Sequence, residues 1–532
     1  MAPLAGVGVR ERDRRSDRRR LLGLQRGVRM EKGLILGVDL GTTACKAIVV
    51  DPEGRELSSG SATYPLHTPH PSWAEQDPEE VWEGMVEAVR EALSGLDDPQ
   101  SVRALAFSTA MHGVLAVDKE GIPLTRCLIW ADQRSTSQVE RIRQQADAHQ
   151  LYRRTGCPVQ PIFLPAKILW LREERPQVVR RAHKYVSIKD VILHRLTGQY
   201  LVDRSTASAT GLMDTHRLDW DDEILGLVGI VREQLPQLVS PEAVLEGILP
   251  QRAEELGLSL EIVIVPGAGD GGLANLGAGA VEAGQVASTI GTSGAVRMVT
   301  RRPYLDPKER TWCYLLTEGR WYVGGAIANG GLAYNWFRDR FFSHREEVDY
   351  EELDAAAEEV GLGAEGLLFL PYLAGERNPH WNPKARGVLF GLSLHHGRRH
   401  IARAIMEGVA FCMYDILLVL EGAVGGIEEI RATGGFTRSP LWVQILSDVY
   451  GHPIATLGTQ ASSSLGAVFL AMKALGYIED LAEVRGLVPI QRIYEPDMER
   501  HRRYRELHQL FQKLYRDLEE DFDTLHDLST RG

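Results

Sequence analysis

A glycine–threonine hairpin occurs twice in this chain of 532 residues, and this repetition constrains its fold more than any other feature. The stretch LILGVDLGTTACKAIVV, from Leu34, places two β-rich runs around Gly41-Thr42-Thr43. A related stretch, VASTIGTSGAVRMVT, places two more runs around Gly291-Thr292-Ser293. Runs of β-branched residues joined by short glycine turns predict antiparallel strands. The sequence therefore predicts an internally duplicated chain with one such hairpin in each half.

Helical segments follow each hairpin, at 78–93, 350–360 and 400–420. In the last of them the apolar residues recur at helical spacing, which indicates one face packed on a core. Each half is therefore expected to be mixed α/β. Because a chain this long exceeds what one hydrophobic core usually supports, we expect two domains divided near 282–285.

Composition and charge exclude several classes of function. The chain is 44% hydrophobic and 25% charged, as in ordinary globular proteins, and no apolar run is long enough to span a bilayer. Its net charge is −12 although the first 29 residues hold nine Arg against three acids, so the body is acidic and unsuited to nucleic acid. Five scattered cysteines suggest neither a disulfide framework nor a zinc site. We expect a cytoplasmic protein with neither nucleic-acid nor membrane partners.

The first hairpin has the residues of a phosphate-binding loop. Its glycine permits close approach, successive backbone N–H groups can surround an anion, and Lys46 adds positive charge. Asp39 precedes the turn and is suited to hold Mg²⁺ directly or through water. An ordinary structural hairpin is the alternative for either turn alone. Two such turns, one from each half, would grip a polyphosphate from both sides.

The segment VPGAGDGGLANLG holds a glycine-rich turn after a β-rich run. Gly267, Gly269 and Gly272 fit the G-x-G-x-x-G pattern of dinucleotide-binding dehydrogenases. That class requires an acidic residue about 20 residues further on, where this chain has only Ser, Thr, Ile and Gly. Asp270 within the turn is either a general base for phosphoryl transfer or a residue that caps the next helix.

Polar and aromatic side chains at the ends of β-rich runs indicate a site for a polyol. Met111 and His112 lie in STAMHGVLAVD, and Trp130 and Asp132 lie in WADQRS. A buried structural role is the alternative for His112 and for Trp130. The chain contains no G-x-x-x-x-G-K-[ST] motif, which excludes an ordinary P-loop nucleotide-binding protein.

Two signatures resemble the FGGY family of carbohydrate kinases. The first is GVLFGL at 387–392, followed after seven residues by His400-Ile401 and then by AIME at 404–407; the second, PAKILWL at 165–171, is similar with slightly different spacing. The resemblance covers about 33–497. It implies an α/β fold of two actin-like, ribonuclease-H-like domains flanking a central cleft. We expect an N-terminal domain at 31–283, a C-terminal domain at 284–500, a charged helical tail at 501–532 and an Arg-rich head without assigned function at 1–30.

The resemblance also implies the roles of the site residues. Asp270 would be the catalytic base, would contact the acceptor, and with Asp39 would surround Mg²⁺. The ATP phosphates would be bound by Thr42, Thr43, Lys46, Gly291 and Thr292, and the nucleoside by Gly331, Asn335, Gly434, Gly435 and Ser439. The acceptor would be bound by Met111, His112, Trp130 and Asp132.

Within the family, SAMH, WADQRS and the GDG-x-L-x-NLG turn resemble the bacterial gluconate kinases. Xylulose kinases usually carry Gln where this chain has Ala110, and the smaller side chain leaves room for a six-carbon acceptor. The acceptor carboxylate has more than one potential partner, including Arg134 and Arg377. The alternatives are a xylulose or other polyol kinase, a nucleotide-switched protein without kinase activity, and the dehydrogenase class weakened above. The sequence does not decide whether the protein forms a homodimer.

Overall fold

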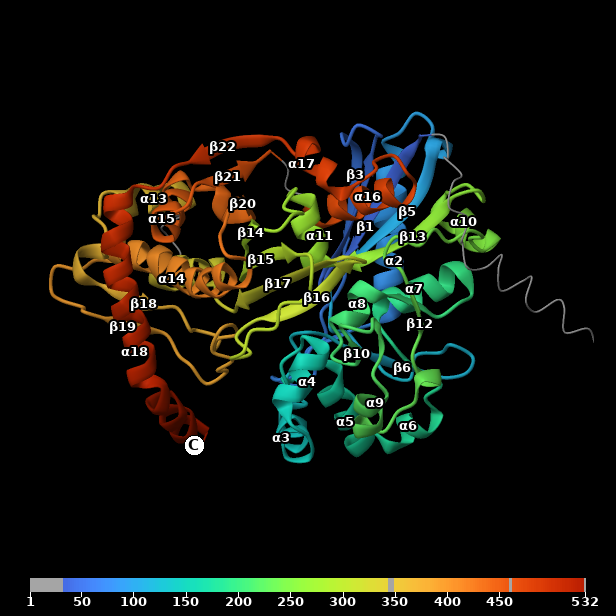
Figure 1. The fold of residues 1–532 in the computed structure, drawn as a ribbon, viewed down its shortest axis with the longest axis horizontal. Coiled ribbons are helices and arrows are strands. Elements are labelled where there is room, and N and C mark those ends of the chain that lie inside the picture. Colours follow the sequence, from blue (N-terminus) through green and yellow to red (C-terminus); the bar gives the residue numbers. More distant parts are fainter. Residues whose placement is uncertain (1–31, 343–348, 459–461, 531–532) are drawn as a thin grey trace, which may run out of the picture.

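A computed structural model describes residues 32–342, 349–458 and 462–530, so the expected head at 1–30 lies outside the described residues. Two β-sheets form the centres of two α/β halves, which lie side by side in Figure 1. A third group of elements, α3, α4, α5, α6 and α9, gathers below the first half in that view. No helix in the described part of the chain is long and apolar enough to cross a membrane.

The first sheet has the strand order β13-β5-β1-β2-β3. Its bounds are β1 (Leu34–Leu40), β2 (Ala44–Val50), β3 (Glu56–Thr63), β5 (Val102–Thr109) and β13 (Val263–Gly269). The first three strands form an antiparallel meander, and β5 and β13 run parallel to β1. Three parallel strands therefore end at one edge, where the polar turns that follow them lie close together.

The second sheet has the order β16-β17-β15-β14-β20-β21-β22. Its bounds are β14 (Gln285–Ile290), β15 (Gly294–Thr300), β16 (Trp312–Thr317), β17 (Arg320–Ile327), β20 (Glu429–Thr433), β21 (Ile454–Leu457) and β22 (Ile490–Tyr494). The strands β17-β15-β14 are antiparallel, and β20 and β21 run parallel to β14. Those five strands repeat the arrangement of the first sheet, which confirms the predicted duplication.

Helices cover the sheets where the sequence carries apolar faces. Asp77 caps α2 (Pro78–Ser94) by accepting a hydrogen bond from Glu79 N–H, and the helix packs on β2 and β3. In the second half α14 (Arg398–Val424) packs between α15 (Pro440–Tyr450) and the strands β15, β17 and β18 (Leu368–Leu370). The final helix α18 (Met498–Thr530) runs along the outer side of this half (Figure 1) and buries Tyr504, Phe511 and Tyr515 against its core.

The remaining elements complete the two halves. In the first half these are β4 (Glu75–Gln76), β6 (Leu115–Val117), β7 (Cys127–Leu128), α3 (Thr136–Gln145), α4 (Ala148–Thr155), α5 (Leu164–Glu174), α6 (Pro176–Arg181), β8 (Lys184–Val186), α7 (Ile188–Thr197), β9 (Leu201–Asp203), α8 (Arg204–Ser208), β10 (Met213–Asp214), β11 (Asp219–Trp220), α9 (Asp222–Val228), β12 (Gln237–Val239) and α10 (Pro250–Leu256). In the second half they are α12 (Gly331–Phe341), α13 (Tyr350–Glu358), β19 (Val388–Phe390) and α17 (Val484–Leu487).

Two helices join the halves: α11 (Asp270–Gly277) and α16 (Ser462–Ala474) pack on each other between the sheets (Figure 1). The contact is close, since a Cβ added at Gly466 would lie 2.0 Å from the carbonyl oxygen of Leu273. Although α16 comes late in the chain, it packs on β1 and β5 of the first sheet. The ends of β1 and β13 therefore lie at the junction of the halves.

Candidate functional site

Asp270 is the first residue of α11, directly after β13. Its Oδ1 accepts a hydrogen bond from Gly271 N–H at 2.7 Å. Burial first, and the charge of Asp39 second, raise the pKa of Asp270 to about 6, while Arg297 and Arg377 act in the opposite direction. A carboxylate with this pKa is ionised at neutral pH and is still basic enough to take a proton, as a general base requires.

Close packing around Asp270 requires glycine at the positions before and after it. Gly267 has a φ of +70°, and a Cβ there would lie 1.7 Å from the carbonyl oxygen of Phe107 on β5. A Cβ on Gly269 would lie 2.5 Å from Sδ of Met111, and one on Gly272 would lie 2.9 Å from the ring of Tyr322. The three glycines of the G-x-G-x-x-G match thus allow close contact with β5, with the segment of Met111 and with Tyr322 on β17.

Asp39 lies directly opposite Lys46 in the β1–β2 ladder, so both side chains project from one face of the sheet. Its Oδ2 accepts a hydrogen bond from Ser463 Oγ of α16 at 2.9 Å. Its Oδ1 is buried and has no hydrogen-bond partner among the described residues. A carboxylate oxygen that has no hydrogen-bond partner and lies beside a phosphate-type loop suits a hard cation such as Mg²⁺.

The first hairpin turn is fixed by hydrogen bonds from side chains outside the turn. The carbonyl oxygen of Gly41 accepts from the Tyr64 hydroxyl at 2.7 Å and from Gln76 Nε2 at 2.9 Å, and Gln76 also donates to the carbonyl of Thr42 at 2.9 Å. The Thr42 hydroxyl accepts from the indole N–H of Trp130 at 3.0 Å, and Thr43 is exposed. The turn is thus fixed in one conformation before any ligand arrives.

The second hairpin turn is bonded to the start of α12. The carbonyl of Gly291 accepts from Gly331 N–H at 2.7 Å, and that of Thr292 accepts from Leu332 N–H at 3.0 Å. Gly434 follows β20 with a φ of +102°, and a Cβ there would lie 2.4 Å from the carbonyl oxygen of Ile290. The structure therefore brings three of the predicted nucleotide-binding segments together at the ends of β14 and β20.

The outer residues of this group have local structural partners. Asn335 on α12 accepts a hydrogen bond from the Tyr350 hydroxyl at 2.8 Å. Ser439 caps α15 by accepting from Trp442 N–H at 3.2 Å. Gly435 begins the single turn between Gly434 and Ser439. All of the predicted nucleotide-binding residues of the second half thus lie on elements that meet around the Gly291 turn.

His112 lies in the segment after β5 and has a φ of +67°. Its Nδ1–H donates to the carbonyl oxygen of Ala209 at 2.8 Å, and its ring makes edge contacts with Phe163 and Tyr314. Burial first, and the charge of Lys167 second, lower the pKa of His112 to about 3. The ring is therefore neutral, and Nε2 is its hydrogen-bond acceptor. Beside it, Sδ of Met111 accepts from the Tyr322 hydroxyl at 3.3 Å.

Lys167, whose role sequence reasoning missed, joins the two segments that carry His112 and Trp130. Its ammonium, fully buried on α5, donates to the carbonyl oxygens of His112 and Ile129, each at 2.7 Å. Burial lowers the pKa of Lys167 to about 7. A lysine inside the apolar stretch PAKILWL was the available signal.

Asp132 and Arg134 form a buried structural unit. Asp132 is fully buried; it accepts from Ala74 N–H at 2.7 Å and pairs with Arg134 at 2.7 Å. Arg134 also pairs with Glu75 at 2.7 Å and lies 3.8 Å from the ring centroid of Trp73. Since both oxygens of Asp132 already accept hydrogen bonds, its contact with an acceptor stays a prediction.

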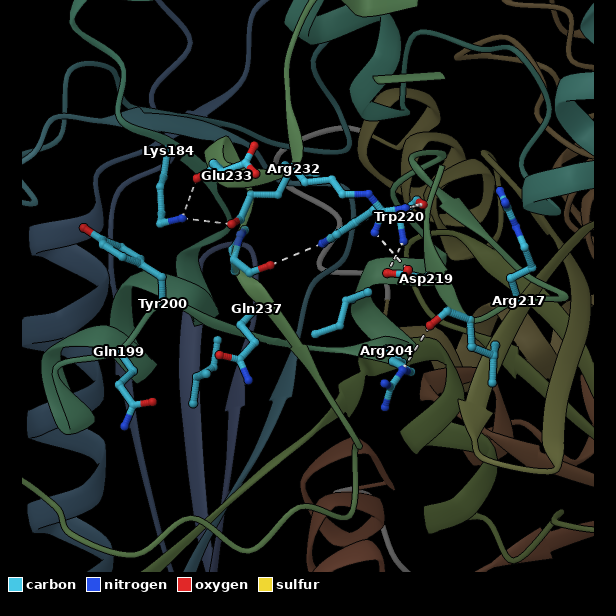
Figure 2. A pocket seen from close by; sticks show the side chains of 15 residues that line it. Lys184, Gln199, Tyr200, Arg204, Arg217, Asp219, Trp220, Arg232, Glu233 and Gln237 are labelled. Atoms are coloured by element: carbon cyan, nitrogen blue, oxygen red, sulfur yellow. Dashed lines mark hydrogen bonds and ion pairs between the residues drawn. The ribbon is translucent and has the colours of Figure 1, made fainter. Parts of the chain in front are cut away.

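A separate open pocket lies between β9, β12 and the β10–β11 hairpin and contains none of the predicted site residues (Figure 2). Its cations have partners within the protein. Lys184 donates to the carbonyl oxygens of Glu233 and Leu235 at 2.8 and 2.9 Å, and Arg232 donates to that of Trp220 at 2.6 Å. Because Lys184 and Arg232 already donate to backbone carbonyl oxygens, they are poorly suited to bind an anionic ligand in this pocket.

Comparison with known proteins decides the family. The N-terminal domain of the FGGY family of carbohydrate kinases matches residues 34–277, and its C-terminal domain matches 286–475. The chain belongs to the FGGY family of carbohydrate kinases. The expected α/β fold of two actin-like domains is thereby confirmed, as is the assignment to the carbohydrate kinases, which use ATP.

This FGGY kinase is similar to the gluconokinase of Bacillus subtilis (strain 168), at 38% identity over 93% of this chain and 98% of the relative. Two solved structures from Lactobacillus acidophilus, a gluconate kinase and a ligand-bound xylulose kinase, each match with a TM-score of 0.89 and 32% identity. Each covers 92% of this chain and 99% of its own. The backbone of this FGGY kinase is thus shared by relatives named for two different acceptors.

Proposed function

We propose that this kinase transfers the γ-phosphoryl group of ATP to the terminal hydroxyl of D-gluconate and releases ADP and 6-phospho-D-gluconate. The observation that carries the proposal is the position of Asp270, whose pKa is raised to about 6 at the junction of the two halves. Asp270 follows β13, which pairs with β5, and β5 pairs with β1, so the segment of Met111 and His112 and the first hairpin turn follow neighbouring strands of the same sheet. In this proposal Asp270 takes the proton of the attacking hydroxyl.

The nucleotide is proposed to bind between the hairpin turns. Thr42, Thr43 and Lys46 would contact the phosphates from the first half, and Gly291 and Thr292 would contact them from the second. The nucleoside would lie against Gly331, Asn335, Gly434, Gly435 and Ser439. A Mg²⁺ ion would be held by Asp39 and Asp270, because such sites need only one or two carboxylates besides the phosphates, and it would offset charge on the transferred group.

Gluconate is favoured as acceptor by the SAMH, WADQRS and GDG-x-L-x-NLG segments, and by the likeness to a gluconokinase over nearly the whole chain. Neutral His112 offers Nε2 to an acceptor hydroxyl, since its Nδ1–H is already donated to Ala209. Trp130 is proposed to line the same site. Asp132 would hold the Trp130 segment in place through its bonds to Ala74 and Arg134.

Xylulose is the second candidate acceptor, because a xylulose kinase structure matches this backbone as well as a gluconate kinase structure does. Identification of the product distinguishes the two. Incubation with ATP, Mg²⁺ and D-gluconate should yield one phosphomonoester on carbon 6 by ³¹P and ¹H NMR, with one ADP formed per ester. If gluconate gave no ester and xylulose gave one, xylulose would become the assigned acceptor and the kinase assignment would stand. A cytoplasmic location and a homodimer stay predictions.

A further inference from the structure

Gluconate carries a carboxylate, so its site should offer a cation that the protein itself does not neutralise. Three cations near the predicted site are engaged. Arg134 is paired with Asp132 and Glu75. Lys167 donates to backbone carbonyls, and Arg297 donates to Asn275 Oδ1 at 3.1 Å and to Thr289 Oγ1 at 3.0 Å. Each of them would have to give up a buried partner in order to bind a ligand.

Arg377 differs from these three. Its guanidinium has neither a hydrogen-bond nor an ion-pair partner within residues 32–342, 349–458 and 462–530, and it is partly exposed. It lies 5.7 Å from the ring centroid of Trp130 and interacts electrostatically with Asp270 and His112. A cation that makes no hydrogen bond or ion pair with the described residues therefore lies among the base and two residues predicted to line the acceptor site.

The segment that carries Arg377 is anchored on both sides. Oε1 of Glu376 accepts from the backbone N–H groups of Ala328 and Arg377 at 2.9 and 2.7 Å. Asn378 exchanges hydrogen bonds with the backbone of Ala326, at 2.9 Å through its Oδ1 and at 3.1 Å through its N–H. A fixed backbone reduces the ordering that ligand binding would otherwise require.

A second brace comes from the final helix. The His380 ring stacks on Tyr515 of α18 with centroids 3.7 Å apart, and Asn382 Nδ2 donates to the Tyr515 hydroxyl at 3.3 Å. Residues beyond the family's matched C-terminal domain, which ends at 475, thus help to hold the segment of Arg377.

We propose that Arg377 binds the carboxylate of the sugar-acid acceptor and so sets the preference for aldonates over uncharged polyols. The proposal rests on the proposed function and extends it. A guanidinium matches a carboxylate through two parallel N–H donors, which fixes the orientation of the acid as well as its charge. With the carboxylate at Arg377, the far end of the acceptor chain is the part that is left to approach Asp270.

The test compares Arg377→Gln and Arg377→Lys with wild type in steady-state assays of gluconate phosphorylation. Arg377→Gln should raise KM for gluconate on the order of 10-fold to 100-fold, with a much smaller change in kcat and in KM for ATP. Arg377→Lys keeps the charge and loses the paired donors, so its KM for gluconate should lie between those of wild type and Arg377→Gln. Unchanged melting temperatures would show that both variants are folded. The gluconate preference over xylulose should fall in the same order.

Two results would overturn the proposal. A large loss of kcat with an unchanged KM for gluconate would place Arg377 on the transferred phosphoryl group. An equal loss of kcat/KM for gluconate and xylulose would remove it from acceptor choice. Wild-type protein that phosphorylates xylulose and leaves gluconate unchanged is a separate result, because it refutes the proposed function itself.

Discussion

The indole N–H of Trp130 donates to the hydroxyl of Thr42 at 3.0 Å, so a residue predicted to line the acceptor site contacts the turn predicted to hold phosphate. Trp130→Phe keeps an aromatic ring and removes this donor. We expect KM for ATP and KM for the acceptor both to rise, on the order of 3-fold to 10-fold, because one hydrogen bond contributes about 1 kcal/mol. A rise in acceptor KM alone would show that the contact does not link the two sites.

Asp270→Asn should lower kcat on the order of 10² to 10⁴-fold, because the variant keeps the shape of the side chain and loses the base. Binding of ATP, measured by calorimetry, should remain close to wild type. If the variant retained more than half of the wild-type kcat, Asp270 would not be the base.

The same substitution should change stability in a pH-dependent way. Burial and Asp39 raise the pKa of Asp270 from 3.8 to about 6, so ionisation of this group destabilises the fold above pH 6, and the cost disappears as the pH falls toward 3.8. We expect metal-free Asp270→Asn to be more stable than wild type at pH 8, by on the order of 1 to 3 kcal/mol. Denaturant titrations at pH 8 and pH 5 measure this, and an advantage that grew on acidification would contradict the assigned shift.

Acceptor choice is expected to depend on Ala110, whose N–H donates to the carbonyl of Leu40 at the ends of β5 and β1. Ala110→Gln should reduce kcat/KM for gluconate roughly 10-fold to 200-fold more than for xylulose, since a larger side chain shortens the pocket. His112→Ala is the comparison, because it should lower turnover of both acceptors by a similar factor. Equal losses in Ala110→Gln would remove this position from acceptor choice.

Closure of the two halves is a further expectation, because Lys46 on β2 and Thr292 in the turn between β14 and β15 belong to different halves. A non-hydrolysable ATP analogue together with gluconate should reduce the radius of gyration in small-angle X-ray scattering, whereas either ligand alone should have less effect. An unchanged radius with both ligands would show that the site is assembled without closure.

The sequence predicted the parts of the site that depend on local pattern. Both hairpin turns and the strand before Asp270 follow from glycine turns and runs of β-branched residues, and the helix from Pro78 lies where the sequence predicts a helical segment at 78–93. Contacts between distant segments could not be predicted in this way. Ser463 reaches Asp39 because α16 packs on the first sheet, 424 positions away in the chain.

The cations near the site are ambiguous in the sequence for a related reason. Arg134 and Arg377 were equivalent as partners for a carboxylate until the structure showed which of them already has acidic neighbours. Lys167 likewise lay within a recognised signature, but its bonds to two separate segments depend on the packing of α5. The local sequence shows that such residues are charged, but it does not show which distant groups form hydrogen bonds or ion pairs with them.

The most direct test of this account is the ratio of kcat/KM for D-gluconate to kcat/KM for D-xylulose, measured with wild-type protein at saturating ATP and Mg²⁺ by coupled detection of ADP. The account predicts a ratio of about 10 or more, because a charged partner and a longer pocket both favour the six-carbon acid. A ratio below one would contradict gluconate as the acceptor.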